Sequence, residues 1–182
     1  MKRPTLTIMG SAGSGKGTQA ALLEEQLGYH IVEAGSIFRT KSSEDSDLGR
    51  KVKQINDSGG HASDELITEL MADHMKEYIT GEPVLIDGYP RTLGQAKALT
   101  ALLTDANYDP DQFLAIWIKV DRKEAERRLM NRSQCTVCKT VYMTRDVTTC
   151  PHCNGEVKPR DYDNPEAIAK RLDFFEKETM QA

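Results

Sequence analysis

Apolar positions along this chain fall into two kinds of segment, short strand-like runs and longer runs with helical spacing. The predicted strands are Thr5–Met9, Tyr29–Glu33, Val84–Asp87 and Phe113–Val120. The last is a nearly continuous apolar run, which is typical of a strand buried on both faces of a parallel sheet. The predicted helices are Gly17–Leu27, Ser63–Met75, Leu93–Thr104, Asp121–Arg132 and a segment from Asn164 onward. The alternation predicts an α/β fold, a parallel sheet with helices on both faces.

The ends and faces of these helices are also marked in the sequence. Three helix starts carry N-cap or capping-box residues: Ser63-Asp64, Asp121 with Glu124, and Asn164-Pro165. The first helix is expected to stop at Gly28, and Ala21, Leu22 and Leu27 are predicted to face the core. Residues 34–60 are polar and punctuated by Ser, Asp and Gly, so short helices outside the main core are expected there.

Length and charge limit the classes of function to consider. The 182 residues suffice for one domain with small insertions, and a net charge of −4 disfavours general attraction to nucleic acid. No apolar run approaches the roughly 20 residues of a membrane span, and no signal-peptide pattern is present. We therefore expect a cytoplasmic protein that binds neither membranes nor nucleic acid. Its four cysteines are expected to be reduced or metal-bound.

The strongest chemical motif is GSAGSGKGT at residues 10–18, between the first predicted strand and helix. A phosphate-binding loop has this context, because glycines let backbone N–H groups curl around phosphate oxygens while the helix N-terminus faces the anion. Lys16 supplies a cation for the β and γ phosphates. Gly17 replaces the usual hydroxyl after the lysine, so Mg²⁺ is expected to be held mainly by phosphates and water. The alternative is a Gly/Ser-rich turn that binds nothing.

The cysteines form a second motif, Cys135-x2-Cys138 followed by Cys150-x2-Cys153. Two knuckles of this spacing can hold one Zn²⁺ tetrahedrally, with bonds of about 2.3 Å to each thiolate. Four thiolates leave no open coordination position, so the predicted zinc is structural. The alternative is four unliganded thiols.

Arginines flank the cysteine segment on both sides. Arg128 and Arg132 lie four residues apart on the preceding predicted helix, while Arg160 and Arg171 follow the last cysteine. A zinc-stabilised segment between arginine-bearing arms is suited to close over phosphates. Because glutamates lie next to Arg128 and Arg132 in the sequence, an exposed, salt-bridged helix face is the alternative for that pair.

Together these features resemble the adenylate kinase family in its zinc-lid form. The resemblance runs from the first strand to about Thr179 and rests on four stretches: the loop at 10–18, Ser63-Asp64-Glu65-Leu66, Asp87-Gly88-Tyr89-Pro90-Arg91-Thr92, and the cysteine insert between Arg132 and Arg160. It implies a P-loop NTPase-type core (1–34, 64–132 and 163–182), a nucleoside-monophosphate-binding insert (35–63) and a zinc lid (133–162). It further implies reversible, Mg²⁺-dependent phosphoryl transfer from ATP to AMP, giving two ADP. A monomer is expected.

The resemblance implies roles at matching positions. The residues implied in binding ATP are Gly13, Ser14, Gly15, Lys16, Gly17, Thr18, Arg128 and Arg132. Those implied in binding AMP are Ala34, Arg39, Gly88, Arg91, Gln95, Arg160 and Arg171. Those implied in catalysis are Lys16, Asp87, Arg91, Arg132, Arg160 and Arg171, with Asp87 and Asp163 acting through metal-bound water or lid hydrogen bonds.

Some of these positions can also be judged from the residues alone. Asp87 ends a predicted parallel strand, where such sheets bind ligands. Gln95 stands three residues after Thr92 and can instead complete a capping box. Arg39 precedes the acidic pair at 44–45 and can instead be a solvated surface charge.

Three departures from the family pattern leave questions open. Glu33-Ala34-Gly35-Ser36 stands where the family usually has Ser-Thr-Gly-Asp, and alanine there resembles UMP/CMP kinases, which makes a pyrimidine monophosphate kinase the second hypothesis. Residues 139–149 make a shorter span between the knuckles. The chain ends at Ala182, where the family continues with a strand and a helix, so a fragment or a smaller sheet is expected. A third hypothesis is a P-loop protein whose zinc ribbon binds nucleic acid or a partner.

Overall fold

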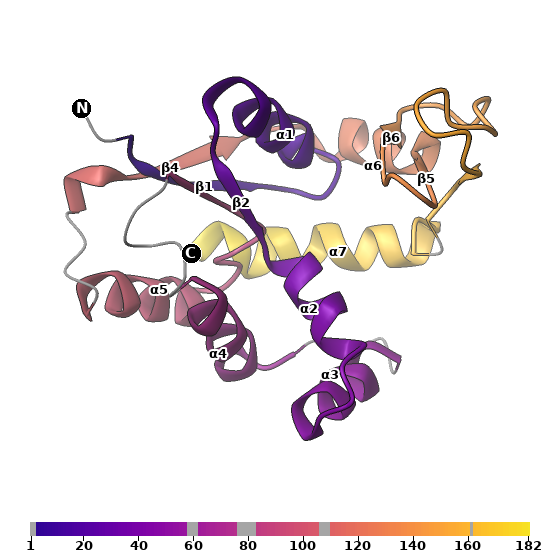
Figure 1. Cartoon of the computed structure of the whole chain (residues 1–182). Helices are drawn as coiled ribbons and strands as arrows, with labels where there is room; N and C mark the ends of the chain where they lie inside the picture. Colours follow the sequence, from indigo (N-terminus) through magenta and orange to yellow (C-terminus); the bar gives the residue numbers. More distant parts are fainter. Residues whose placement is uncertain (1–2, 58–61, 76–82, 106–109, 161) are drawn as a thin grey trace. The chain divides into compact units, whose positions relative to one another are not determined.

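The structure is a computed structural model that describes residues 3–57, 62–75, 83–105, 110–160 and 162–182. Residues 58–61 of the predicted monophosphate-binding insert and residue 161 of the predicted zinc lid therefore lie outside the described residues. The elements in chain order (Figure 1) are β1 (Thr5–Gly10), α1 (Lys16–Leu27), β2 (His30–Glu33), α2 (Ala34–Ser42), α3 (Asp47–Asp57), α4 (Asp64–Met75), β3 (Val84–Asp87), α5 (Leu93–Asp105), η1 (Pro110–Gln112), β4 (Phe113–Ile118), α6 (Arg122–Asn131), β5 (Ser133–Cys135), β6 (Val141–Tyr142), β7 (Val157–Lys158), α7 (Pro165–Lys177) and η2 (Thr179–Gln181).

The chain divides into two compact units. The first unit comprises Met1–Met9, Lys16–Ile118 and Glu178–Ala182, and the second comprises Gly10–Gly15 and Lys119–Lys177. The first unit contains the main sheet with α1 to α5. The second contains Gly10–Gly15 of the glycine-rich loop, α6, α7 and the cysteine segment. Among the described residues, none of the helices combines the length and apolar character that a membrane span requires.

The main sheet has the strand order β2-β3-β1-β4, and β3 pairs in parallel with both β1 and β2. Successive strand residues point to opposite faces. Val84 and Ile86 accordingly pack in one core cluster with residues of α4 and α5, whereas Leu85 packs in another with Ala20 of α1 (Figure 1). The predicted parallel sheet with helices on both faces is confirmed.

The predicted burial of the last strand is wrong. β4 ends at Ile118, and the exposed fractions of Leu114, Ile116 and Trp117 are 51%, 37% and 43%. β4 lies at the edge of the sheet, next to β1. An edge strand has a neighbour on one side only, and an apolar run by itself does not distinguish an edge strand from a central one.

The predicted core face of the first helix is also wrong. Ala20 is 1% exposed and Leu23 is half-buried, whereas Ala21, Leu22 and Leu27 are exposed. Apolar residues occur on more than one side of this helix, so the packing of Ala20 against Leu6 and Ile8 of β1, and not the sequence pattern, selects the buried side.

Helix capping follows the sequence at two of three starts. The backbone N–H of Leu66 donates to Ser63 Oγ (3.3 Å), and that of Ala167 donates to Asn164 Oδ1 (2.9 Å). The capping box at Asp121 is wrong, because Asp121 makes no side-chain cap hydrogen bond. The partner that the box requires, Glu124, accepts hydrogen bonds from arginines of its own helix instead.

The segment after β2 forms α2 and α3, the short helices expected there. They pack against α4 in a small cluster of their own, around the buried residues Val52, Leu66 and Leu70.

In the second unit, α6 and α7 pack through Ala125, Leu129, Ile168 and Leu172. The cysteine segment forms a three-stranded antiparallel sheet of order β6-β5-β7.

Candidate functional site

The glycine-rich loop follows β1 and leads into α1, the predicted strand, loop and helix context. Inside the loop, the N–H of Ser14 donates to Ser11 O (3.1 Å). Gly13 has φ +81°, and a Cβ there would lie 2.8 Å from Ala125 O of α6, so glycine alone fits this position. Ser14 Oγ is buried and has no hydrogen-bond partner within the described part of the chain. A buried hydroxyl of this kind is suited to a bound polar group.

The remaining loop residues lie at its end. Gly15 has φ +98°, a backbone conformation that favours glycine. Lys16 is the first residue of α1, and Gly17 and Thr18 are exposed in its first turn.

Arg128 of α6 lies against the loop, with Nη1 3.4 Å from Gly13 O and 3.5 Å from Ser14 O. Its Nε donates to Glu124 (2.7 Å), which also accepts two hydrogen bonds from Arg127. These guanidinium groups, Arg127 foremost, lower the pKa of Glu124 to about 2. The salt-bridged helix face considered from the sequence is therefore present at Arg128. Its contact with a nucleotide stays a prediction.

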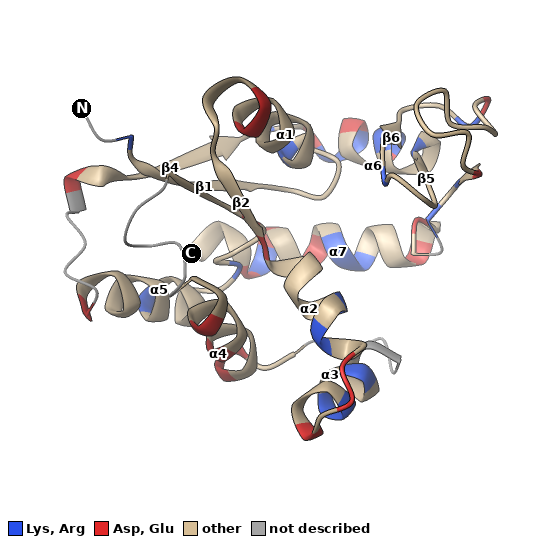
Figure 2. Cartoon of the chain, viewed as in Figure 1, with Lys and Arg blue, Asp and Glu red and all other residues tan. Residues whose placement is uncertain are grey.

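A buried carboxylate joins two further arginines of the second unit. Arg132 donates from Nε and Nη2 to the two oxygens of Asp163, both at 2.8 Å, and Arg171 Nη1 donates to Asp163 Oδ1 at 3.1 Å. The Asp163 side chain is 0% exposed. Burial lowers the pKa of Arg171, and the charge of Arg132 acts in the same direction. The Asp163 carboxylate thus holds both guanidinium groups in place, but its single negative charge balances only one of their two positive charges. Figure 2 shows basic and acidic residues interleaved along α7, from which Arg171 projects.

In the first unit, charged side chains gather where β2 and β3 end. Asp87 is opposite Glu33 in the parallel register, and a Cβ on Gly17 would lie 3.9 Å from Asp87 Oδ2. Burial raises the pKa of Asp87, and the charge of Glu33 adds to the rise, while Lys16 and Arg91 oppose it. The carboxyl edge of a parallel sheet is where α/β proteins bind ligands.

The raised pKa of Asp87 predicts a gain in stability on substitution. From about pH 4 upward the unfolded chain releases this proton before the folded chain does, so wild-type stability falls with pH until Asp87 ionises in the folded state. Asn does not titrate. Asp87→Asn is therefore expected to unfold at higher urea concentration than wild type at pH 7, with a smaller difference at pH 4. A variant that is less stable than wild type at pH 7 would contradict this account.

Arg91 folds back onto the turn that follows β3. Its Nε donates to Gly88 O (2.7 Å), and a Cβ on Gly88, which has φ +77°, would lie 2.9 Å from Arg91 Nη2. The positive φ favours glycine at this position, and any side chain there would also displace the end of the Arg91 side chain.

Gln95 is buried (5% exposed) and hydrogen-bonded at both ends of its side chain. Oε1 accepts from Arg91 N (2.8 Å), and Nε2 donates to Asp64 Oδ1 (2.8 Å). Thr92 Oγ1 accepts from Gln95 N and donates to Asp64 Oδ2, so Thr92 caps α5. Gln95 is thus part of the helix-start network that the capping alternative anticipated, although it bonds Arg91 N and not Thr92 N. Contact with an acceptor base stays a prediction.

Arg39 of α2 is paired with Glu33. Nη2 lies 3.2 Å and 3.3 Å from the two carboxylate oxygens, and the Arg39 side chain is 58% exposed. The neighbouring Ala34 is buried in the main core.

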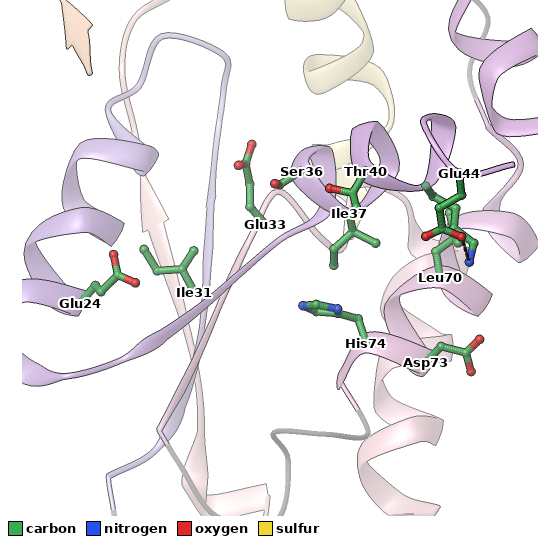
Figure 3. Close-up of a pocket in the computed structure, with 11 residues that line it drawn as sticks. Glu24, Ile31, Glu33, Ser36, Ile37, Thr40, Glu44, Leu70, Asp73 and His74 are labelled. Carbon is green, nitrogen blue, oxygen red and sulfur yellow. Dashed lines mark ion pairs between the residues drawn. The ribbon is translucent and has the colours of Figure 1, made fainter. Parts of the chain in front are cut away.

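A cavity of about 490 Å³ lies in the first unit (Figure 3). Ile31, Ile37 and Leu70 form its apolar wall, and the imidazole of His74 lies beside it. The further lining residues are Glu24, Glu33, Ser36, Thr40, Lys41, Glu44 and Asp73. The lining includes none of the predicted ATP- or AMP-binding residues.

The four cysteine sulfurs lie within 4.8 Å of one another. Cys135 Sγ is 3.4 Å from Cys153 Sγ, and Cys138 Sγ is 3.5 Å from Cys150 Sγ. A tetrahedral zinc with bonds of about 2.3 Å requires sulfur–sulfur distances of about 3.8 Å, so this donor set fits the ion. The four residues predicted as zinc ligands are thus brought together by the fold.

The chain matches the adenylate kinase family model over residues 8–182. It is 36% identical to an adenylate kinase of Alkaliphilus oremlandii, an alignment that covers 96% of this chain and 82% of the relative. It is 37% identical to an adenylate kinase of Salinispora tropica (92% and 78%) and 32% identical to one of Acetivibrio thermocellus (96% and 82%). The chain belongs to the adenylate kinase family. The predicted family and its P-loop α/β fold are thereby confirmed.

Within this adenylate kinase fold, the structure adds contacts that the sequence analysis missed. Arg160 Nε donates to Gln134 Oε1 of β5 (2.7 Å), and the guanidinium groups of Arg160 and Arg171 both lie over the ring of Tyr162. Beside the cysteines, Tyr142 Oη is 3.2 Å from Cys150 Sγ, and Thr140 Oγ1 is 3.1 Å from Cys138 Sγ. In the sequence, Gln134 and Tyr162 stand next to predicted site residues, whereas Thr140 and Tyr142 lie two and four residues after Cys138.

Proposed function

We propose that the chain catalyses reversible, Mg²⁺-dependent transfer of the γ-phosphoryl group of ATP to AMP, giving two ADP. Membership of the adenylate kinase family carries this proposal. The geometry supports it: a glycine-rich loop leads into Lys16, and Asp87 and Arg91 stand at the carboxyl end of β3.

The donor nucleotide is assigned to the loop and the arginines of the second unit. Loop N–H groups, Ser14 Oγ and Lys16 bind the ATP phosphates, because a left-handed glycine loop and a helix N-terminus together favour anions. Arg128 contacts the donor adenine. Arg132, Arg160 and Arg171 neutralise charge on the transferred group.

The acceptor is assigned to residues of the first unit. Arg39 and Arg91 bind the AMP phosphate, with Gly88 allowing close approach of the backbone and Gln95 contacting the base. Ala34 lies beside the base. Binding of AMP then requires Arg39 to exchange its exposed ion pair with Glu33 for the phosphate, a small cost because exposed pairs contribute little.

The proposed reaction requires correctly placed substrates and positive charge around the transferred group. The AMP phosphate is already an anionic nucleophile, so transfer needs no general base, and the requirements are in-line placement and positive charge around the equatorial oxygens. Mg²⁺ bound with ATP would supply further positive charge, and Asp87 would help to hold the ion through water. Asp87→Asn is therefore expected to lower kcat about 10- to 100-fold while raising stability.

We further propose that residues 35–63 bind the monophosphate and that residues 133–162 act as a lid. Their separate small cores, around Val52 and around Cys135 and Cys150, support treating them as distinct inserts. Closure would exclude water and so prevent ATP hydrolysis.

Zinc is proposed to stabilise the lid insert. The segment's own core consists of two cysteines and Val157, with Tyr142 and Val147 packed against it, so few apolar contacts hold it together. We expect about one zinc per chain by elemental analysis. Cys150→Ser is expected to lose the metal and to lower the melting temperature by about 2–4 °C for each kcal/mol lost. Thr149→Ser is the matched control. A metal-free protein that melts like the zinc-bound form would contradict a structural role.

The function is tested by coupled kinetics with AMP, CMP, UMP and GMP as acceptors. AMP is expected to give the highest kcat/KM. Comparable values for CMP or UMP would instead support a pyrimidine monophosphate kinase, which Ala34 favours. Absence of transfer to any monophosphate would contradict both.

A further inference from the structure

Two guanidinium groups lie over the ring of Tyr162. Arg160 Cζ lies 5.8 Å from the ring centroid, and Arg171 Cζ lies 5.4 Å from it. Both distances are within the range of about 6 Å for cation–π attraction. The tyrosine is 45% exposed, so the core does not account for its position.

Each of the two arginines is also anchored by a hydrogen bond. Arg160 Nε donates to Gln134 Oε1, and Arg171 Nη1 donates to the buried Asp163. A guanidinium has five N–H groups. Among the described residues, each of these two guanidinium groups makes one hydrogen bond and one ring contact, which restrain its plane and leave other N–H groups for a ligand.

An aromatic ring differs from a carboxylate in what it does to a paired arginine. A carboxylate neutralises the cation and occupies two of its N–H groups when it binds bidentately, as Asp163 does with Arg132. A ring attracts the cation through its quadrupole, leaves the charge in place and can leave the donors available.

We propose that Tyr162 is a positioning residue that orients Arg160 and Arg171 toward the phosphoryl group in transfer. The inference rests on the proposed function. It predicts that the ring of Tyr162, and not its hydroxyl, is what the reaction requires.

The test compares Tyr162→Phe, which keeps the ring, with Tyr162→Leu, which keeps apolar bulk. Two exposed cation–π contacts correspond together to about a 5- to 30-fold change in rate. We expect kcat of Tyr162→Leu to fall by that factor with KM for ATP and AMP within about threefold. Tyr162→Phe is expected to stay within about twofold of wild type. Both variants should retain the zinc content of wild type. Tyr162→Phe should also keep the melting temperature, whereas Tyr162→Leu should melt a few degrees lower because it loses the two ring contacts.

A second readout is independent of activity. The ring current of Tyr162 should displace the Nε–H proton resonances of Arg160 and Arg171, and this displacement should persist in the Phe variant and vanish in the Leu variant. Resonances that are the same in the Leu variant and wild type would overturn the contact.

The kinetic outcomes separate the two proposals. Equal kcat in wild type and Tyr162→Leu, or an equal loss in both variants, would overturn the positioning role alone. A wild-type chain that forms no ADP would overturn the proposed function.

Discussion

Lys16→Met is expected to lower kcat for ADP formation by about 10²- to 10³-fold, with little change in the urea midpoint of unfolding. Lys16 is the first residue of α1, directly after the glycine-rich loop, and its charge acts on Asp87 in the same unit. A placed cation that stabilises charge developing on the transferred phosphoryl group acts mainly in the transition state, so kcat should fall more than affinity for ATP. Steady-state kinetics at saturating ATP and AMP measure the effect.

Lys170→Met is the matched control for this substitution. Lys170 lies on α7 with 73% of its side chain exposed, in a surface pair with Glu166. Its removal is expected to leave kcat unchanged. If Lys16→Met and Lys170→Met had equal kcat, the assignment of Lys16 to the donor phosphates would be wrong.

Asp163→Asn is expected to destabilise the protein by about 3–5 kcal/mol, because it leaves guanidinium groups partly buried without their counter-charge. The Asp163 side chain is 0% exposed and that of Arg132 is 13% exposed, so solvent screens this pair little. Arg171 is 34% exposed and adds less. Since total stabilities are about 5–15 kcal/mol, urea unfolding should detect the loss easily.

The control for Asp163→Asn is Glu166→Gln, on the first turn of α7. Glu166 forms an ion pair of similar length with Lys170 (2.7 Å), but it is 79% exposed. An exposed pair is screened by water, so no measurable change in unfolding free energy is expected. Equal effects of the two substitutions would show that burial of Asp163 does not set the strength of its pairing.

The features that the sequence predicted well have a local cause. The loop context, the Ser63 and Asn164 caps and the cysteine knuckles each depend on residues a few positions apart. Residues a few positions apart in the sequence have relative positions that the local backbone conformation sets, largely independently of the rest of the fold. Two alternatives considered from the sequence are partly realised: Gln95 belongs to the network that caps α5, and Arg128 pairs with Glu124 on its own helix. The contacts of Gln95 with Thr92 and of Arg128 with Glu124 likewise join residues three or four positions apart.

Several features that the sequence analysis predicted wrongly or missed are set by distant partners, although the Asp121 capping box fails for a local reason, the pairing of Glu124 with arginines of its own helix. Whether β4 is central or at an edge depends on strand order, and the buried side of α1 depends on which residues of β1 it meets. Arg132 and Asp163 are separated by 31 positions, and nothing in their spacing indicates a bidentate pair.

By itself, the sequence determined the α/β class, the family, the glycine-rich loop with Lys16 and the four cysteines. It did so because these depend on residue type and short spacing. Only the tertiary structure decided that Asp163 binds two arginines, that Glu33 pairs with Arg39 and that the Tyr162 ring contacts both Arg160 and Arg171. Ion pairs and ring contacts of these kinds require the packing of elements that the local pattern leaves unspecified, and the same packing decides which charges are buried and how strongly they interact.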